Sequence, residues 1–154
     1  MNKFIYLMLL PVVMGRQMSI GRTLSMGSGE SYVFHSTPAT FEEAKAICRQ
    51  DGGSLAVITS QEEEDKMLKL WKGPVENSSN GCNYQAFIGI HSLNQEGHWE
   101  TIDGTSLQYT NWSPTWTGRQ QPDNPDRQKC GSLLKEGGMD DYECYFKIAF
   151  FCEK

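Results

Sequence analysis

The final stretch of the chain, GGMDDYECYFKIAFFCEK (residues 137–154), carries the features that decide the fold. Residues 148–152 are apolar and predict a short buried strand at the end of the domain. Ahead of them stand two adjacent acids, Asp140 and Asp141. Neighbouring residues of a strand point to opposite faces, so this pair is poorly placed to act as the acid and base of a glycosidase. With no nucleophile motif or phosphate loop elsewhere, we expect a binding protein rather than an enzyme.

A long segment without apolar periodicity lies upstream, from Asn111 to Gln128, and is rich in Pro, Asn, Asp and Gly. Loops of this length are uncommon inside a compact domain and are often functional. Strand signals stand on both sides of it. Residues 86–90 predict a buried strand, residues 99–109 a hairpin, and residues 131–134 another short strand.

Two amphipathic helices are predicted earlier in the chain, each behind a capping signal. Thr40 and Glu43 form a capping box for the first helix, and Ser60 and Glu63 repeat the arrangement for the second. The apolar residues that share a face are Phe41, Ala44, Ile47 and Cys48 in the first and Met67, Leu68 and Trp71 in the second. A short strand is expected between them at Leu55–Ile58. The fold class is therefore α+β: two helices and a mostly antiparallel sheet that carries one long loop.

The beginning of the chain predicts export. Residues 1–21 contain an apolar run that is too short to span a bilayer, and small residues suit cleavage after Gly15 or after Gly21. A short polar lead is expected over residues 22–30 and one domain over residues 31–154. No second long apolar stretch follows, so we expect a secreted protein that does not insert into membranes.

Secretion favours disulfides among the five cysteines, which are Cys48, Cys82, Cys130, Cys144 and Cys152. They form no CxxC pair, and the three histidines lack zinc-ligand spacing with them. Because five is an odd number, at least one thiol is free or bonds another chain. A formal charge of -5 provides no basic surface for nucleic acid or anionic membranes, whereas acidic side chains can serve calcium.

The order of these parts resembles the C-type lectin-like domain over roughly residues 31–154. Four segments carry the resemblance. Phe87-Ile88-Gly89-Ile90 occupies the place of the family's usual Trp-Ile-Gly-Leu, and Gln121-Pro122-Asp123 matches its galactose-type Gln-Pro-Asp motif. Met139-Asp140-Asp141 occupies the place of Trp-Asn-Asp, and Ala149–Glu153 matches the family's terminal strand. The chain looks closest to short insect haemolymph lectins, including the lipopolysaccharide-binding type, and to bracovirus lectins. The resemblance implies the disulfides Cys48–Cys152 and Cys130–Cys144.

The resemblance also implies a calcium ion at the long loop that coordinates two vicinal sugar hydroxyls. Matched by position, the residues that hold the metal and hydrogen-bond the sugar are Gln121, Asp123, Gln128, Asp140 and Asp141. Two of them depart from the pattern, since Gln128 replaces a glutamate and Asp140 an asparagine. Three of the five candidate ligands are still carboxylates, but Asp140 cannot donate the hydrogen bond that an asparagine amide would donate to the sugar. The Gln121-Pro122 bond is expected to be cis, as the resemblance implies.

Galactose-type sites stack an aromatic ring on the sugar, and Pro125 occupies the usual tryptophan position here. Trp116 is our candidate for that ring, with Trp112 and Tyr142 as alternatives. Asn77 begins a glycosylation sequon in a predicted loop.

We therefore expect a calcium-dependent lectin for glycans on microbial or cell surfaces, acting in insect innate immunity or in a parasite's interference with it. A homodimer linked through Cys82 would raise the avidity of weak sites. Two other interpretations remain open. The Gln-Pro-Asp segment could be ordinary turn chemistry, and Gln128 with Lys129 favours a calcium-independent module that binds protein.

Overall fold

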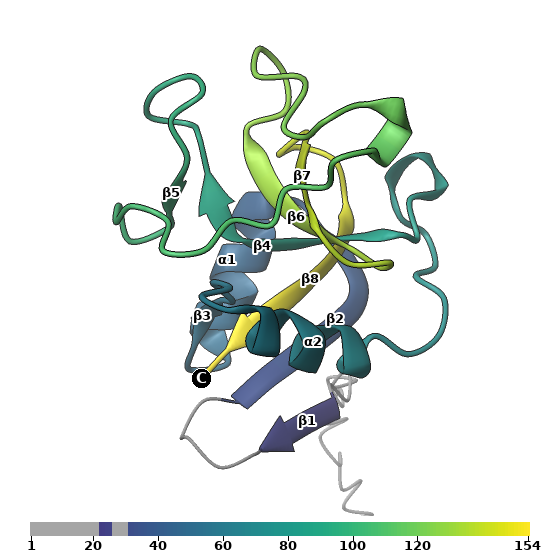
Figure 1. Cartoon of the computed structure of the whole chain (residues 1–154). Helices are drawn as coiled ribbons and strands as arrows, with labels where there is room; N and C mark the ends of the chain where they lie inside the picture. Colours follow the sequence, from purple (N-terminus) through teal and green to yellow (C-terminus); the bar gives the residue numbers. More distant parts are fainter. Residues whose placement is uncertain (1–21, 26–30) are drawn as a thin grey trace, which may run out of the picture.

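The structure, a computed structural model, describes residues 22–25 and 31–154 (Figure 1). The expected signal peptide and both candidate cleavage sites lie outside the described residues. The helices are α1 (Phe41–Gln50) and α2 (Gln61–Leu70), and two short 3-10 turns are η1 (Ser79–Gly81) and η2 (Trp116–Gly118). The strands are β1 (Arg22–Ser25), β2 (Ser31–Ala39), β3 (Ser54–Leu55), β4 (Gln85–His91), β5 (Glu100–Thr101), β6 (Cys130–Leu134), β7 (Met139–Tyr142) and β8 (Ile148–Glu153).

One sheet joins the strands in the order β1-β2-β8-β4-β6-β7, with β3 paired to β8 and β5 to β4. Every pair is antiparallel except β4 with β8, which run parallel. The expected α+β class with a mostly antiparallel sheet is confirmed. The chain from β5 to β6, which contains the long loop, lies at the end of the molecule away from β1 (Figure 1).

The predicted capping signals begin both helices. Before α1, the Thr40 hydroxyl accepts from the Glu43 amide at 3.3 Å, and the Thr40 amide donates to the Glu43 carboxylate at 2.9 Å. Before α2, the Ser60 hydroxyl accepts from the Glu63 amide at 3.3 Å. The Glu63 carboxylate accepts from the Thr59 amide and hydroxyl instead, both at 2.7 Å. Its backbone partner is therefore the residue before the N-cap rather than the N-cap Ser60.

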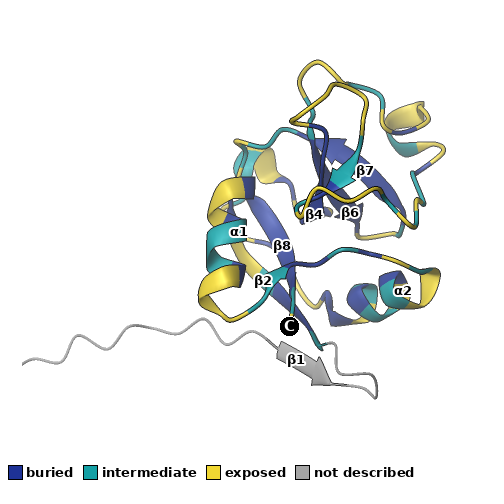
Figure 2. Ribbon diagram, turned by 90° about the vertical axis from the view of Figure 1, so that its left-hand side faces the viewer, coloured by how far each residue is buried: buried dark blue, intermediate teal, exposed yellow. Residues whose placement is uncertain are grey.

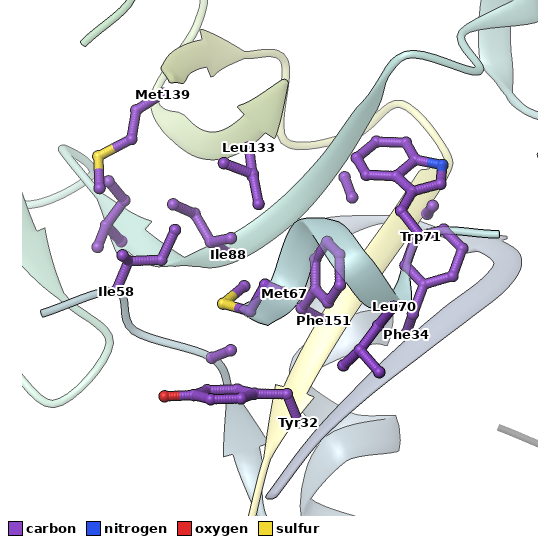
Figure 3. Packing of buried hydrophobic residues seen from close by; sticks show 14 of the residues in the cluster. Tyr32, Phe34, Ile58, Met67, Leu70, Trp71, Ile88, Leu133, Met139 and Phe151 are labelled. Carbon is purple, nitrogen blue, oxygen red and sulfur yellow. The ribbon is translucent and has the colours of Figure 1, made fainter. Parts of the chain in front are cut away.

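The helices cover opposite faces of the sheet, and each face has its own apolar cluster (Figure 2). Phe150 belongs to the cluster under α1 and Phe151 to the cluster under α2, as alternation along β8 requires. On the α2 side, the Phe34 ring lies 5.1 Å from Trp71 and 5.0 Å from Phe151 (Figure 3). The central strand β8 is thus buried on both faces and fixes the two layers.

Both expected disulfides are present. Cys48–Cys152 ties α1 to β8 across 104 residues, and Cys130–Cys144 ties the start of β6 to the segment after β7 across 14 residues. Cys82 is the free cysteine among the described residues.

Cys82 is buried, and its side chain is 0% exposed. Its sulfur lies 3.5 Å from the Gln85 amide oxygen, and burial raises the pKa of the thiol. A buried sulfur held as a thiol cannot reach or attack a cysteine of another chain while the domain is folded. The expected disulfide-linked dimer through Cys82 is therefore not supported by this fold.

Three strand expectations differ from the structure. Strand β1 lies in the segment expected to be a polar lead, where it pairs with β2. Strand β3 ends at Leu55 rather than at Ile58, since the Val57 amide donates to the Glu153 side chain and not to a strand. In the expected hairpin, β5 pairs with β4, and only one isolated bridge joins Glu100 to Ser106.

Candidate functional site

The long loop is anchored by backbone hydrogen bonds to strand β7 and to itself. The Met139 amide donates to the Asn111 carbonyl at 2.7 Å, and the Ser113 amide donates to the Met139 carbonyl at 2.9 Å. The Gln121 amide then donates to the Ser113 carbonyl at 2.8 Å. These bonds place the Gln-Pro-Asp segment beside Asp140 and Asp141 of β7. The Gln121-Pro122 peptide bond is cis, as expected.

A pocket of about 490 Å³ opens between this loop, β7 and the start of β4. Five of the six candidate residues border it: Trp116, Gln121, Asp123, Gln128 and Asp140. Sequence reasoning missed four further lining residues that bear on its chemistry, namely Tyr84, Gln85, Arg119 and Asn124. The residues that the motifs predicted to act together are therefore neighbours in space.

Asp141, the sixth candidate, is fully buried beneath the loop and is not a lining residue. Its two carboxylate oxygens accept from the Asp123 and Asn124 amides, both at 3.0 Å. Burial raises the pKa of Asp141, and these backbone bonds oppose the rise. In this arrangement Asp141 holds the backbone that presents Asp123.

Asp140 points the other way, into the pocket, where the Gln85 amide donates to its carboxylate. Burial, with the charge of Asp141 as the next cause, raises the pKa of Asp140 to about 8. A cation bound beside Asp140 would offset that cost by favouring the charged carboxylate.

Within the described part of the chain, the side-chain amide of Gln121 has a hydrogen-bond partner for its nitrogen but not for its oxygen. Gln121 is 3% exposed, and its Nε2 donates to the Trp116 carbonyl at 3.0 Å. Its Oε1 is buried without a hydrogen-bond partner among the described residues. Buried polar atoms almost always have partners, and amide oxygens are calcium ligands. The chemistry of Gln121, Asp123 and Asp140 therefore fits a hard divalent cation.

Two lining side chains are engaged elsewhere. Asp123 Oδ2 lies 3.8 Å from the Arg119 guanidinium, and the Gln128 amide donates to Glu143 at 3.0 Å. Within residues 31–154, no three His, Cys, Asp or Glu side chains lie close enough together to hold a metal ion. Metal binding at this site would thus require the side chains that line the pocket to rearrange.

Trp116 is the aromatic side chain best placed for a sugar. It borders the pocket and packs against Tyr84, whose ring centre lies 5.3 Å away and which is 41% exposed. Trp112 instead packs against Trp99 at 4.8 Å and joins the apolar cluster under α2. Tyr142 borders the pocket but is buried against Phe87.

The sequon residue Asn77 is exposed, which is compatible with glycosylation. Its glycosylation stays a prediction. Asn111 begins a second sequon (Asn111-Trp112-Ser113), and its side-chain amide donates to both oxygens of Glu64 at 3.1 Å. Among the described residues, no helix is both long and apolar enough to cross a bilayer.

Comparison with known proteins gives consistent results. The lectin C-type domain model matches residues 37–154. A hemolymph lipopolysaccharide-binding protein of Periplaneta americana is 38% identical over 79% of this chain and 48% of that protein, so the chain spans about half of that relative. An alpha-N-acetylgalactosamine-specific lectin of Patiria pectinifera is 28% identical over 82% of this chain and 74% of that protein. The solved mouse scavenger receptor C-type lectin carbohydrate-recognition domain is 28% identical, with a TM-score of 0.70 over 84% of this chain and 91% of that chain.

Proposed function

Because the chain belongs to the C-type lectin domain family, we propose that it is a secreted protein that binds carbohydrate through calcium, with galactose-type specificity. The observation that carries this proposal is the buried Oε1 of Gln121, which has no partner among the described residues. Gln121 borders the same pocket as Asp123 and Asp140. A calcium ion there would supply what this oxygen lacks.

The residues of the site have two roles, as metal ligands and as supports of the loop backbone. Gln121, Asp123 and Asp140 offer oxygen ligands from the pocket wall, and Gln128 offers an amide oxygen while its amide nitrogen donates to Glu143. Asp141 lies beneath, where it fixes the Asp123 backbone, and it would join the ligand set only if the loop shifted. Calcium, when bound, would coordinate two neighbouring hydroxyls of the sugar directly.

The preference for galactose-like sugars follows from the donors and acceptors on either side of the proline. The Gln121 amide can donate to a sugar hydroxyl, whereas the Asp123 carboxylate can only accept from one. Trp116 would cover the apolar face of the sugar ring. The similarity to an alpha-N-acetylgalactosamine-specific lectin supports this choice.

The partners we propose are glycans on microbial or cell surfaces. The support is the similarity to a hemolymph lipopolysaccharide-binding protein, which also favours secretion into an extracellular fluid and a role in innate immunity or in a parasite's interference with it.

A glycan array tests the proposal when it is run once with calcium and once with chelator. We expect galactose-terminated glycans to be retained only with calcium. Asp123→Ala should weaken that binding by more than about tenfold, because it removes a charged ligand. Asp126→Ala is the matched control, since Asp126 is exposed in the same loop and does not border the pocket.

One alternative rests on specific observations. Gln128 carries no charge and Arg119 pairs with Asp123, so the charge of the Asp123 carboxylate is balanced without any metal. These features favour a calcium-independent module that binds protein. Equal retention of a ligand in calcium and in chelator, undiminished in Asp123→Ala, would select this alternative.

A further inference from the structure

Arg119 is a charged residue of the pocket that sugar coordination by calcium does not use. It borders the pocket, and its side chain is 74% exposed. Its ion-pair contact with Asp123 is long, at 3.8 Å, and lies at the solvent-exposed mouth, where such pairs contribute little. The guanidinium is therefore available to a ligand.

A tight turn presents Arg119 beside the aromatic surface. Thr117 and Gly118 of η2 have positive φ angles of 55° and 81°, and the Arg119 amide donates to the Trp116 carbonyl at 3.0 Å. Both Trp116 and Arg119 border the same pocket as a result. A sugar whose ring covers Trp116 would have its outer substituents next to the guanidinium.

The charges that line the pocket indicate which substituent would be favoured. Asp123 and Asp140 are the acidic lining residues, Arg119 is the basic one, and the other lining side chains do not carry a charge. Arg119 is the cationic side chain among the residues that line the pocket, so it is the group there that can attract an anionic substituent.

We propose that Arg119 makes this site selective for acidic saccharides that carry a carboxylate beside the coordinated diol, as galacturonic acid does. This inference rests on the proposed calcium-dependent function. Galacturonic acid has the 3,4-diol of galactose, and its carboxylate is attached at C5, next to the carbon that bears one of these hydroxyls. A guanidinium donates to a carboxylate in a paired, planar geometry, which a neutral hydroxymethyl group cannot match.

The test compares methyl α-galactoside with methyl α-galacturonide by calorimetric or NMR titration of the full secreted protein in calcium. We expect the galacturonide to bind about fivefold more tightly at low salt, and 0.5 M NaCl to reduce this ratio toward one. Arg119→Gln should bring the ratio to about one, whereas Arg119→Lys should retain part of it. Arg127→Gln makes the same charge change at an exposed residue of the same loop outside the pocket, and should keep the full ratio.

The outcomes separate the two proposals. Calcium-dependent binding of both sugars with a ratio of one, or a ratio that Arg119→Gln leaves unchanged, overturns the role of Arg119 and leaves the proposed lectin function intact. Failure of both sugars to bind in calcium removes the proposed function and this inference together. Thermal unfolding of each variant, compared with the unaltered protein, confirms that the changed ratio does not come from a misfolded domain.

Discussion

Glu64 shows how one buried side chain can organise a distant loop. It lies on α2 and is 1% exposed, so its carboxylate is buried and needs hydrogen-bond donors. Its oxygens accept from the Tyr109 hydroxyl at 3.1 Å, from the Asn111 amide at 3.1 Å and from the Gly138 backbone amide at 2.8 Å. Tyr109 and Asn111 lead into the long loop, and Gly138 immediately precedes β7. Both segments that meet at the candidate site are thus held by one residue of α2.

Glu64→Ala should therefore destabilise the domain by about 3 kcal/mol, because it leaves several buried donors without an acceptor. Chemical denaturation in chelator measures this loss without interference from metal binding. Glu62→Ala is the control on the same helix, where an exposed pair with Lys66 is removed, and it should change the stability by less than about 0.5 kcal/mol. Equal effects of the two substitutions would contradict the role of Glu64.

The site residues that motifs could predict are those at fixed places in the sequence. Gln121, Asp123 and Asp140 were identified in this way, and they do border one pocket. Arg119 and Tyr84 belong to no motif. They reach the pocket because of a left-handed turn at η2 and because β4 begins beside the loop, and such contacts depend on tertiary packing.

Among the elements, strand β4 makes a close backbone approach to β3 and the residue that follows it. A Cβ atom at Gly89 would lie 2.5 Å from the Leu55 carbonyl oxygen, and the Gly89 amide donates to the Ala56 carbonyl at 2.8 Å. The glycine inside the apolar Phe87–Ile90 run therefore lets the segment after β3 pack directly on β4.

Gly89→Ala should destabilise the domain by about 1–3 kcal/mol, because the backbone of either β3 or β4 must move. Gly104→Ala provides the comparison, since Gly104 has open space around it and a φ of 76°, so only the backbone strain of about 1 kcal/mol applies. Thermal unfolding of the two variants measures both losses of stability. If Gly89→Ala unfolds at the same temperature as the unaltered protein, the close contact between Gly89 and the Leu55 carbonyl is contradicted.

Elements with local signals could be predicted, and elements that depend on distant partners could not. Both helices begin at the residues their capping signals indicate. Strand β2 was not anticipated, because its ladder is with β8 at the other end of the chain and its exposed middle breaks the apolar pattern. Strand β1 lacks apolar alternation and is defined by its pairing with β2.

At the scale of the whole molecule, the two disulfides constrain the unfolded chain unequally. Cys48–Cys152 closes 104 residues and Cys130–Cys144 only 14. Loop-closure entropy predicts that replacing the first pair with alanine costs about 2 kcal/mol more than replacing the second. Chemical denaturation of the two double variants measures the difference. A greater loss from the Cys130–Cys144 pair would show that native contacts, rather than chain entropy, dominate.

The pairing of β2 with β8 has a consequence for how this domain can be used. The Ser31 amide donates to the Lys154 carbonyl at 3.1 Å, and the Lys154 amide donates to the Ser31 carbonyl at 3.0 Å. A unit whose entry and exit points adjoin can be spliced into a surface turn of a host protein without stretching either one. The same architecture therefore suits an inserted module, and its long loop lies at the end of the molecule away from β1 (Figure 1).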